Sequence, residues 1–463
     1  MVDSNTIYKW RHVARVVIEA VSPLMVGSGD KSILTDAEVA VDANGLPFIP
    51  GTALAGVLRH MYGVGADSED TLWGFVRGDK GHGSRLFFSE ARLIGPDGLP
   101  VDGLRPDLGG EFFTELTAGL PVRHHVRIGH KGTAENAGKY DNRVVIKGAR
   151  FCFEIEAIGQ SDDDGGADLA AIVRLFGRAD LRLGGGTRDG YGAMRLVSAQ
   201  CRSFDLGRDG DFEAYAALGS QLGVDVPGGV SLAAPENSDG CEVLRLHLAP
   251  ADFFLFGAAE ADLSGDADMM PVTESEVVWE ADGKPRIAKR RILIPASSVK
   301  GALAHRTAFH YNKLTCVAAE SGDIAAHSGQ RNEAVRELFG YQEADGERRL
   351  HCGKVIMSDV ILPDADATKL LNHVAIDRFT GGAKAGALFT ERVAATGRGF
   401  NLDVVVVNAD SVSPEARKAF LLALRDMATG MLPLGGGNGR GNGFFKADED
   451  TISLINRKLD DAK

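Results

Sequence analysis

Two stretches of the chain place carboxylates just before a recurring octapeptide. DAEVAVDANG begins at Asp36 and precedes IPGTALAG, whereas ESEVVWEADG begins at Glu274 and precedes IPASSVKG. A gapless alignment of these stretches puts Asp36 opposite Glu274, and Asp268 lies slightly upstream in the second. A loop carboxylate can bind a metal ion or accept a proton in catalysis. From these residues alone, an aspartate that caps a turn is the simpler interpretation of Asp36.

Each octapeptide predicts the start of a helix. Pro50 and Gly51 precede the periodic stretch TALAGVLRHMYG, in which Thr52 is the expected N-cap. Small residues at a helix N-terminus also favour anion binding, and helix capping can coexist with it. The residues that offer hydroxyls or positive charge near these helix starts are Thr52, Arg59, Ser297, Ser298 and Lys300.

Two glycine-rich segments, LGGGTRDGYG from Leu183 and LGGGNGRGNG from Leu434, offer backbone N–H groups to an anionic backbone. Arg188 and Arg440 lie inside them, and Tyr191 offers a face for base stacking in the first. The alternative is that the glycines only permit a tight connection before a strand. Neither segment continues into Gly-Lys-Ser/Thr, so no nucleotide cofactor is expected.

The charge balance is acidic, with a local exception. Lys and Arg number 51 against 64 Asp and Glu, for a net charge of −13, which by itself argues against nucleic-acid binding. Between Val122 and Arg150, however, basic residues dominate, with only Glu135 and Asp141 opposing them. The centre of this segment, IGHKGTAENAGKYDN, lacks periodicity and predicts a long protruding loop. A solvated charged loop is the alternative to a binding surface.

Length and composition favour two globular domains in one chain. The 463 residues exceed what one ordinary core accommodates, and no apolar run approaches the roughly 20 residues of a membrane span. The five cysteines are scattered and form no CxxC pair, which favours reduced thiols. Because the N-terminus also lacks a signal-peptide core, we expect a cytoplasmic protein without membrane contact.

Further repeated phrases indicate a duplication. LWG returns as LFG, FSEARL as MSDVIL, and HVRIGHKGTA as HVAIDRFTGGA, in the same order as the octapeptides and the glycine-rich segments. We predict a first domain at 1–205, a connection at 206–240 and a second domain at 241–463. The expected order of elements in each domain is βαββαβ, a ferredoxin-like α+β unit.

These segments resemble the RAMP superfamily of CRISPR-associated proteins, most specifically through IDRFTGGAKAGALFTERV at 376–393. The tandem arrangement is similar to the two-domain backbone subunits of type III (III-D-like) CRISPR effector complexes. The resemblance implies RRM-like domains with protruding thumb hairpins, stacked with other subunits along a CRISPR guide RNA. Cleaving members use a loop aspartate and a divalent metal ion (Mg²⁺ or Mn²⁺) to cut the paired target RNA.

Carried onto this chain, the resemblance makes Asp36 the candidate cleaving and metal-binding residue. Glu274 replaces aspartate in the second copy, and Asp268 is the candidate that can serve instead. The thumbs supply basic residues for phosphates, and Phe379 or Leu388-Phe389 supplies an apolar wedge in the second copy. The thumb residues expected to contact RNA are His125, Arg127, Lys131, Arg378, Phe379, Lys384 and Arg392.

The expected function is therefore a metal-dependent endoribonuclease that acts within an assembled CRISPR complex. Its expected partners are guide RNA, target RNA and the other subunits of that complex. A scaffold subunit that binds RNA without cutting it is the first alternative. A guide-processing RNase is the second, and it is disfavoured because His305 and His310 are five residues apart and do not share a helix face.

Overall fold

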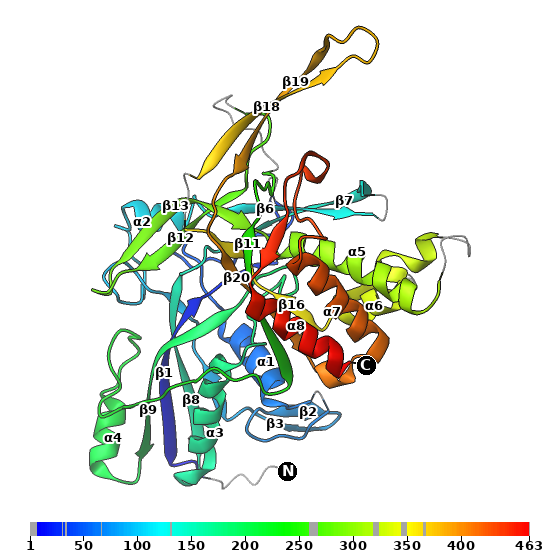
Figure 1. Ribbon diagram of the computed structural model, residues 1–463. Coiled ribbons are helices and arrows are strands. Elements are labelled where there is room, and N and C mark those ends of the chain that lie inside the picture. The colour runs from blue at the N-terminus through cyan, green and yellow to red at the C-terminus, as the bar shows by residue number, and fades with distance from the viewer. Residues whose placement is uncertain are drawn as a thin grey trace.

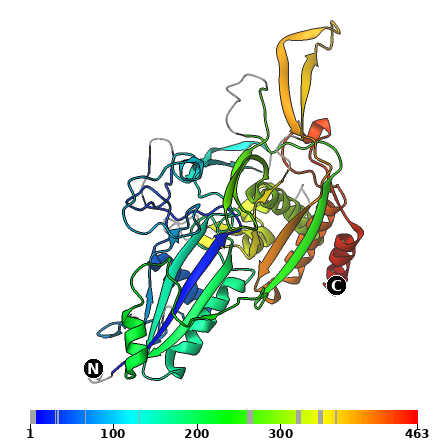
Figure 2. The same cartoon turned by 90° about the vertical axis from the view of Figure 1, so that its left-hand side faces the viewer.

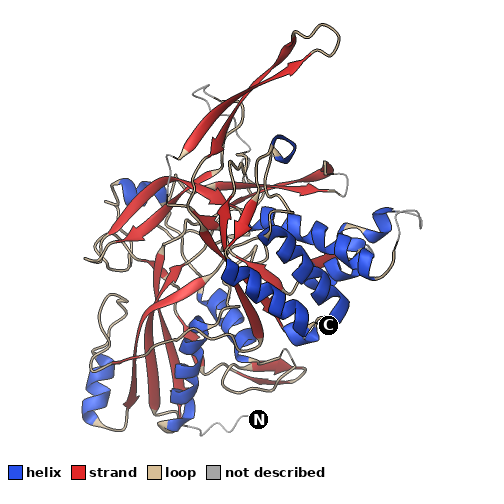
Figure 3. Ribbon diagram, viewed as in Figure 1, coloured by secondary structure: helices blue, strands red, loops and turns tan. Residues whose placement is uncertain are grey.

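The computed structural model describes residues 7–29, 31–32, 35–65, 67–129, 132–258, 267–317, 324–343, 350–363 and 367–462. It is a mixed α+β protein whose two halves each contain an antiparallel sheet with helices packed on it (Figure 1). Figure 3 shows that the helices lie beside the sheets, while paired strands extend away from the body. Lys131, one of the expected thumb residues, lies outside the described residues.

The first sheet is built on three long strands, β1 (Trp10–Ala20), β8 (Arg150–Gly159) and β9 (Met194–Asp205). Its order is β10-β9-β1-β8-β4, where β4 (Leu86–Phe88) and β10 (Val230–Ser231) are short edge strands and β5 (Arg92–Leu93) also pairs with β8. Helices α1 (Gly51–Tyr62) and α3 (Asp163–Arg174) pack on this sheet (Figure 2).

The second sheet repeats this arrangement. Its order is β16-β20-β11-β21, with β16 (Val355–Met357), β20 (Phe400–Val407), β11 (Cys241–Pro250) and β21 (Phe445–Ala447). These strands occupy the places of β4, β8, β1 and β9, so both halves share one strand order. The helices of this half are α5 (Ala296–Leu314), α6 (Glu333–Phe339), α7 (Pro414–Ala428) and α8 (Glu449–Asp461).

Each half has a hydrophobic core of its own. Strand β8 alternates, so that Phe151, Phe153 and Ile155 are fully buried against the helices, as expected for the period of two in a strand. In β20 the same periodicity buries Leu402 and Val404 in the second core. The halves are joined because side chains of β12 (Thr273–Trp279) pack into the first core.

Two hairpins leave the sheets at corresponding points. The first is β6 (Val122–Ile128) with β7 (Ala134–Arg143), and the second is β18 (Thr368–Ile376) with β19 (Ala383–Ala394). The second projects far from the body in Figures 1 and 2. The expectation of a long protruding loop was therefore wrong for residues 134–142, which belong to β7. Their hydrogen bonds come from β6, which local periodicity does not reveal.

The segment at 206–240 contributes to the first sheet. It contains α4 (Asp209–Ala216) and β10, and β10 pairs with β9. The guanidinium of Arg15 donates hydrogen bonds to the carbonyls of Leu218 and Gly219, 3.1 Å away in each case, which ties the segment to β1.

The remaining elements are short or peripheral. They are β2 (Phe75–Arg77), β3 (Lys80–His82), α2 (Glu111–Glu115), β13 (Pro285–Ile294), β14 (Gly340–Gln342), β15 (Leu350–Cys352) and β17 (Val360–Ile361). Over the described part of the chain, every helix is too short or too polar to cross a membrane.

Helix α1 begins differently from the sequence expectation. Pro50 is the N-cap residue, the helix starts at Gly51, and no side chain caps it, so Thr52 is an exposed residue of the first turn. Gly51 lies against the carbonyls of Phe88 and Ser89, where a Cβ atom would clash. The close approach of two backbones explains the glycine.

Candidate nucleic-acid interface

Two loop aspartates bind the bases of the two hairpins in the same way. The backbone N–H of Asp36 donates to the carbonyl of Asp141 (3.2 Å), and its Oδ2 accepts from the N–H of Asp141 (3.1 Å). Asp268 makes the same pair of contacts with Thr390, at 3.0 Å and 2.7 Å. Both aspartates are exposed. Each half therefore presents one loop carboxylate to solvent beside the base of its hairpin.

This pairing makes Asp268, and not Glu274, the counterpart of Asp36. The following residues also correspond, because Ala37 bridges β7 as Met269 bridges β19. The gapless alignment of the two loops was wrong. The second copy contains an additional long hairpin, β12–β13. The cross-strand pair Thr273–Ile292 in this hairpin is equivalent to the pair Val41–Pro47 in the first copy.

Glu274 lies in a buried ion-pair cluster between the halves. Its side chain is 2% exposed, and both of its oxygens bind the guanidinium of Arg123, with Nη2 at 2.7 Å from Oε2. The same Nη2 donates to Oδ2 of Asp359 at 3.0 Å. Glu274 is thus occupied in joining the first hairpin to the second half, whereas Asp268 is an exposed carboxylate at the base of the second hairpin.

A histidine stacks on an aromatic ring at the base of each hairpin. His125 lies on Tyr140 with ring centroids 4.7 Å apart and an interplanar angle of 10°. His373 lies on Phe389 at 4.8 Å and 23°. Burial lowers the pKa of His125, so its ring is neutral at pH 7. The two stacks are equivalent in register, since each histidine is directly opposite its aromatic partner across the hairpin.

Tyr191 contacts His125 of the first stack, and its ring is buried, so it is not accessible for stacking on an RNA base. It is 0% exposed, and its hydroxyl lies 2.7 Å from Nε2 of His125. Burial raises the pKa of Tyr191, so the hydroxyl stays protonated, and the tautomer of His125 decides which of the two groups donates this hydrogen bond. The expected stacking role of Tyr191 is therefore replaced by a structural one.

We expect Tyr191→Phe to lower the free energy of unfolding by about 1–3 kcal/mol, because Nε2 of His125 is left buried without its hydrogen bond. Urea denaturation of the full chain measures this loss. Tyr140→Phe is the matched control, since the Tyr140 hydroxyl is 3.5 Å from Asp189 and the side chain is partly exposed. Equal stability of the two variants would contradict the assigned role.

The cations of the glycine-rich loops have protein partners. Nε of Arg188 donates to the carbonyl of Gly353 (2.7 Å), and Nζ of Lys300 donates to the carbonyl of Arg188 (2.8 Å). Both contacts connect the first glycine-rich loop to the second half. Arg440 pairs with Glu391, and its guanidinium lies 5.4 Å from the ring centroid of Phe389. Arg440 thus joins the second loop to the second stack and stays 39% exposed.

The helix starts are also engaged by protein groups. The N–H of Ala296, at the start of α5, donates to Oδ1 of Asp359 at 2.7 Å, so a carboxylate of the chain already occupies this N–H. Ser298 beside it is exposed and Ser297 is partly buried. In α1, Nη1 of Arg59 donates to the carbonyl of Gly74 at 3.0 Å.

The hairpins carry the most accessible of the predicted RNA contacts. Phe379, at the tip of the second hairpin, is 96% exposed. Arg378 and Lys384 beside it are also exposed, and Arg392 is partly buried at the base. In the first hairpin, Arg127 is largely exposed and lies 3.9 Å from Glu135.

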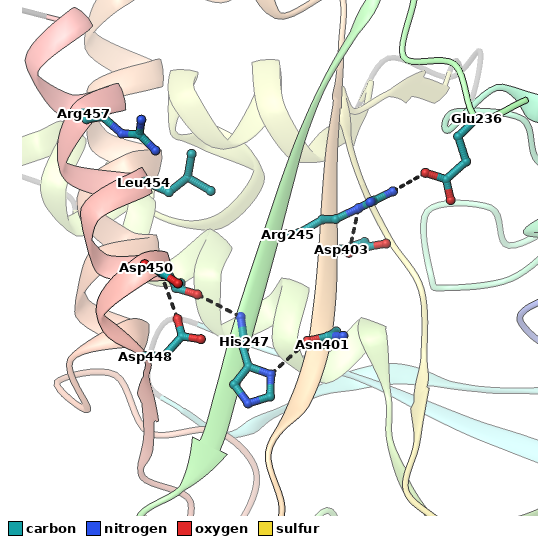
Figure 4. Close-up of a pocket in the computed structure, with 10 residues that line it drawn as sticks. Glu236, Arg245, His247, Asn401, Asp403, Asp448, Asp450, Leu454 and Arg457 are labelled. Carbon is teal, nitrogen blue, oxygen red and sulfur yellow. Dashed lines mark hydrogen bonds and ion pairs between the residues drawn. The ribbon is translucent and has the colours of Figure 1, made fainter.

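A separate open pocket of about 610 Å³ lies between β11, β20 and α8 (Figure 4). Its polar groups bind one another: Arg245 pairs with Glu236 at 2.6 Å, and Nδ1 of His247 lies 2.9 Å from Oδ1 of Asn401. It contains none of the residues that the sequence predicted to act on RNA. The two hairpin bases remain the candidate site.

Two halves with one strand order and repeated sites define a duplicated two-domain protein. The family model of the RAMP superfamily matches residues 17–195 and 281–446, one region in each half. The chain belongs to the RAMP superfamily. No curated protein matches it. Membership supports a CRISPR-associated, RNA-binding subunit.

Proposed function

We propose that this protein is a backbone subunit of a type III CRISPR effector complex, and that it binds guide RNA and cleaves paired target RNA at two sites. One observation carries the proposal: each half holds an exposed aspartate by the same two hydrogen bonds at the base of a hairpin. Both carboxylates also stay exposed beside the hairpin base, where a bound RNA can reach them. The duplication favours a shared function for Asp36 and Asp268.

We further infer that each half is a ferredoxin-like domain with a thumb hairpin. The strand order supports it, because the fourth, first, third and second strands of each repeat are neighbours, in that order, in both sheets. The exposed aromatic and basic residues of the second hairpin support a thumb that wedges into a duplex, since unstacking a base pair needs an apolar side chain and phosphate-binding cations.

The proposed reaction is an internal transesterification of RNA. The 2′-oxygen attacks the adjacent phosphorus, and the bond to the 5′-oxygen breaks. The 5′-oxygen takes a proton from water, so that a 2′,3′-cyclic phosphate and a 5′-hydroxyl result. Asp36 or Asp268 accepts the 2′-hydroxyl proton through its carboxylate. In each site the backbone N–H of the hairpin residue holds one carboxylate oxygen and orients the group.

The residues present fit a divalent cation that takes most of its ligands from RNA. Mg²⁺ is commonly held by one or two carboxylates together with phosphates and water, and each site offers one exposed carboxylate. Among the described residues, no three His, Cys, Asp or Glu side chains gather into a protein-only metal site. Asp36 and Asp268 would hold the ion, which would stabilise charge on the phosphate.

The test is target cleavage by the complex assembled from this chain, the other subunits and guide RNA. With Mg²⁺ and a complementary target, we expect cuts at regular positions within the paired region. Guide binding without cuts would overturn the nuclease and leave the scaffold function. Cleavage of the guide precursor by the isolated chain would instead show a processing RNase.

Phe379→Ala tests the wedge. Because the ring is 96% exposed, the free energy of unfolding is expected to change by less than about 0.5 kcal/mol. We expect target binding by the assembled complex to weaken about 5- to 150-fold, which corresponds to the roughly 1–3 kcal/mol of a base–aromatic stack. Filter binding measures this. Ile324→Ala, at an exposed apolar residue outside the hairpins, is the control, and equal affinity of both variants would exclude the wedge.

A further inference from the structure

The first half has a small open pocket, and the equivalent position in the second half is occupied by a side chain of the chain itself. The volume of the pocket is about 370 Å³, and its lining includes Asp42, Glu90 and Arg92. Arg92 Nη1 lies 3.3 Å from Oδ2 of Asp42, and Nη2 also pairs with Glu90. Two carboxylates therefore share one guanidinium that comes from the same half, and the pocket keeps a negative charge.

The repeat shows what such a pocket binds. The cross-strand pairing that aligns the two loops makes Asp42 the counterpart of Glu274. Glu90 directly precedes Ala91, which pairs with Ile49 just before α1. Asp359 directly precedes Val360, which pairs with Ile294 just before α5, so Glu90 and Asp359 also correspond. In the second half, both carboxylates bind Arg123 from the base of the first hairpin. The guanidinium of another domain thus fills the equivalent place.

The glycine-rich loops show the complementary difference. In the first loop, a Cβ atom on Gly190 would lie 2.7 Å from Oδ1 of Asp359, because this loop is pressed onto the second half. The equivalent Gly441 of the second loop has no atom of the described chain within 4 Å of that position. The chain therefore makes this contact once, between the glycine-rich loop and hairpin of the first half and the carboxylates of the second half. The pocket on the first half and the glycine-rich loop of the second half have no such partner within the described chain.

A second copy of this chain does not suit the open pocket. The register of the second hairpin puts Leu371 in the place of Arg123, directly opposite Glu391. Docking of a second copy would bring a leucine toward Asp42 and Glu90, which leaves the negative charge of the pocket without a counter-charge. The occupant must carry a basic side chain at this hairpin position.

We propose that the pocket formed by Asp42, Glu90 and Arg92 receives an arginine from the hairpin base of a neighbouring, non-identical RAMP-type domain. The inference rests on the proposed role as a subunit of a multi-subunit complex. It assigns the first half as the acceptor face for that neighbour. It also makes the isolated chain unable to polymerise with itself through this face.

The first test is Glu90→Arg in the full chain, coexpressed with the other subunits and guide RNA. Asp42 is left intact, because it also accepts from the N–H groups of Asn44 and Leu46 in its own turn. We expect the yield of complete complex to fall at least about tenfold, since a buried charge contact is replaced by repulsion. Native mass spectrometry should show a subcomplex that lacks the neighbour at the first half. Glu213→Arg on α4 is the charge-matched control.

A photoreactive amino acid at position 90 gives a second measurement that needs no loss of assembly. The expected product is a crosslink to a hairpin strand of a different subunit. A crosslink to RNA or to a second copy of this chain, or a Glu90→Arg complex of unchanged stoichiometry, would overturn the inference. If the wild-type chain fails to assemble with guide RNA, the proposed function itself is wrong, which is a distinguishable result.

Discussion

Replacing both Asp36 and Asp268 by alanine should abolish target cleavage by the assembled complex, while guide binding stays intact. A positioned proton acceptor contributes roughly 10²- to 10⁴-fold to a rate, so each single variant should slow the cuts at its own site by that factor. Each single variant should leave the other site's cuts unchanged, because the two carboxylates bind different hairpins. Gel analysis of an end-labelled target resolves the two sets of products.

The matched variants separate proton transfer from folding. Each carboxylate also accepts a backbone hydrogen bond, so Asp36→Asn keeps the size and the hydrogen-bonding oxygen while removing the charge. We expect it to be as inactive as Asp36→Ala and as stable as the wild type. Glu274→Gln should leave the number of products unchanged, because Glu274 is buried against Arg123. Loss of one product set in Glu274→Gln with intact assembly would reverse the assignment of the second site.

Arg123→Ala is expected to lower the free energy of unfolding by about 3–5 kcal/mol. The side chain is 7% exposed, and its removal leaves Glu274 and Asp359 buried without a counter-charge. Guanidinium chloride denaturation measures the loss. Arg127→Ala, in the same hairpin but exposed and 3.9 Å from its partner, should cost less than about 1 kcal/mol. Equal losses in the two variants would contradict the role of the cluster.

The pH dependence identifies the cause of that loss. Burial raises the pKa of Asp359 from 3.8 to about 6, although Arg123 opposes the shift. The folded state therefore binds more protons than the unfolded state between about pH 4 and 6, so this carboxyl lowers stability as pH rises through that window. Without Arg123 the pKa rises further. The stability difference between Arg123→Ala and the wild type should thus be smaller at pH 5 than at pH 8.

The duplication itself could be predicted from the sequence. Helix starts, the FSEARL and MSDVIL strands and the glycine-rich loops all recur at equivalent places in the two halves. Such landmarks depend on local requirements, such as glycine where the backbone φ is positive, as at Gly184 and Gly435. Alignment of the repeated segments FSEARL and MSDVIL also places Glu90 opposite Asp359, so the correspondence of these two carboxylates was already present in the sequence.

The structural correspondence between the loops of the two copies was decided by tertiary structure. The sequence alignment paired Asp36 with Glu274, because the residues around them are similar in the two copies. The β12–β13 insertion shifts this alignment. The hydrogen bonds to the hairpin show that Asp268 is the residue equivalent to Asp36. The contacts of Tyr191 and Lys300 could not be predicted from the sequence either. Both were expected to face RNA, yet one is buried under His125 and the other bonds to the first glycine-rich loop.

The sequence by itself determined that this is a twofold repeat with loop carboxylates, basic segments and glycine-rich loops in a fixed order. Periodicity and turn residues act over a few positions, so a single chain reports them faithfully. Only the tertiary structure decided which of these groups face solvent and which join the halves. Burial and ion pairing depend on partners more than a hundred residues away, as Arg123 and Glu274 show.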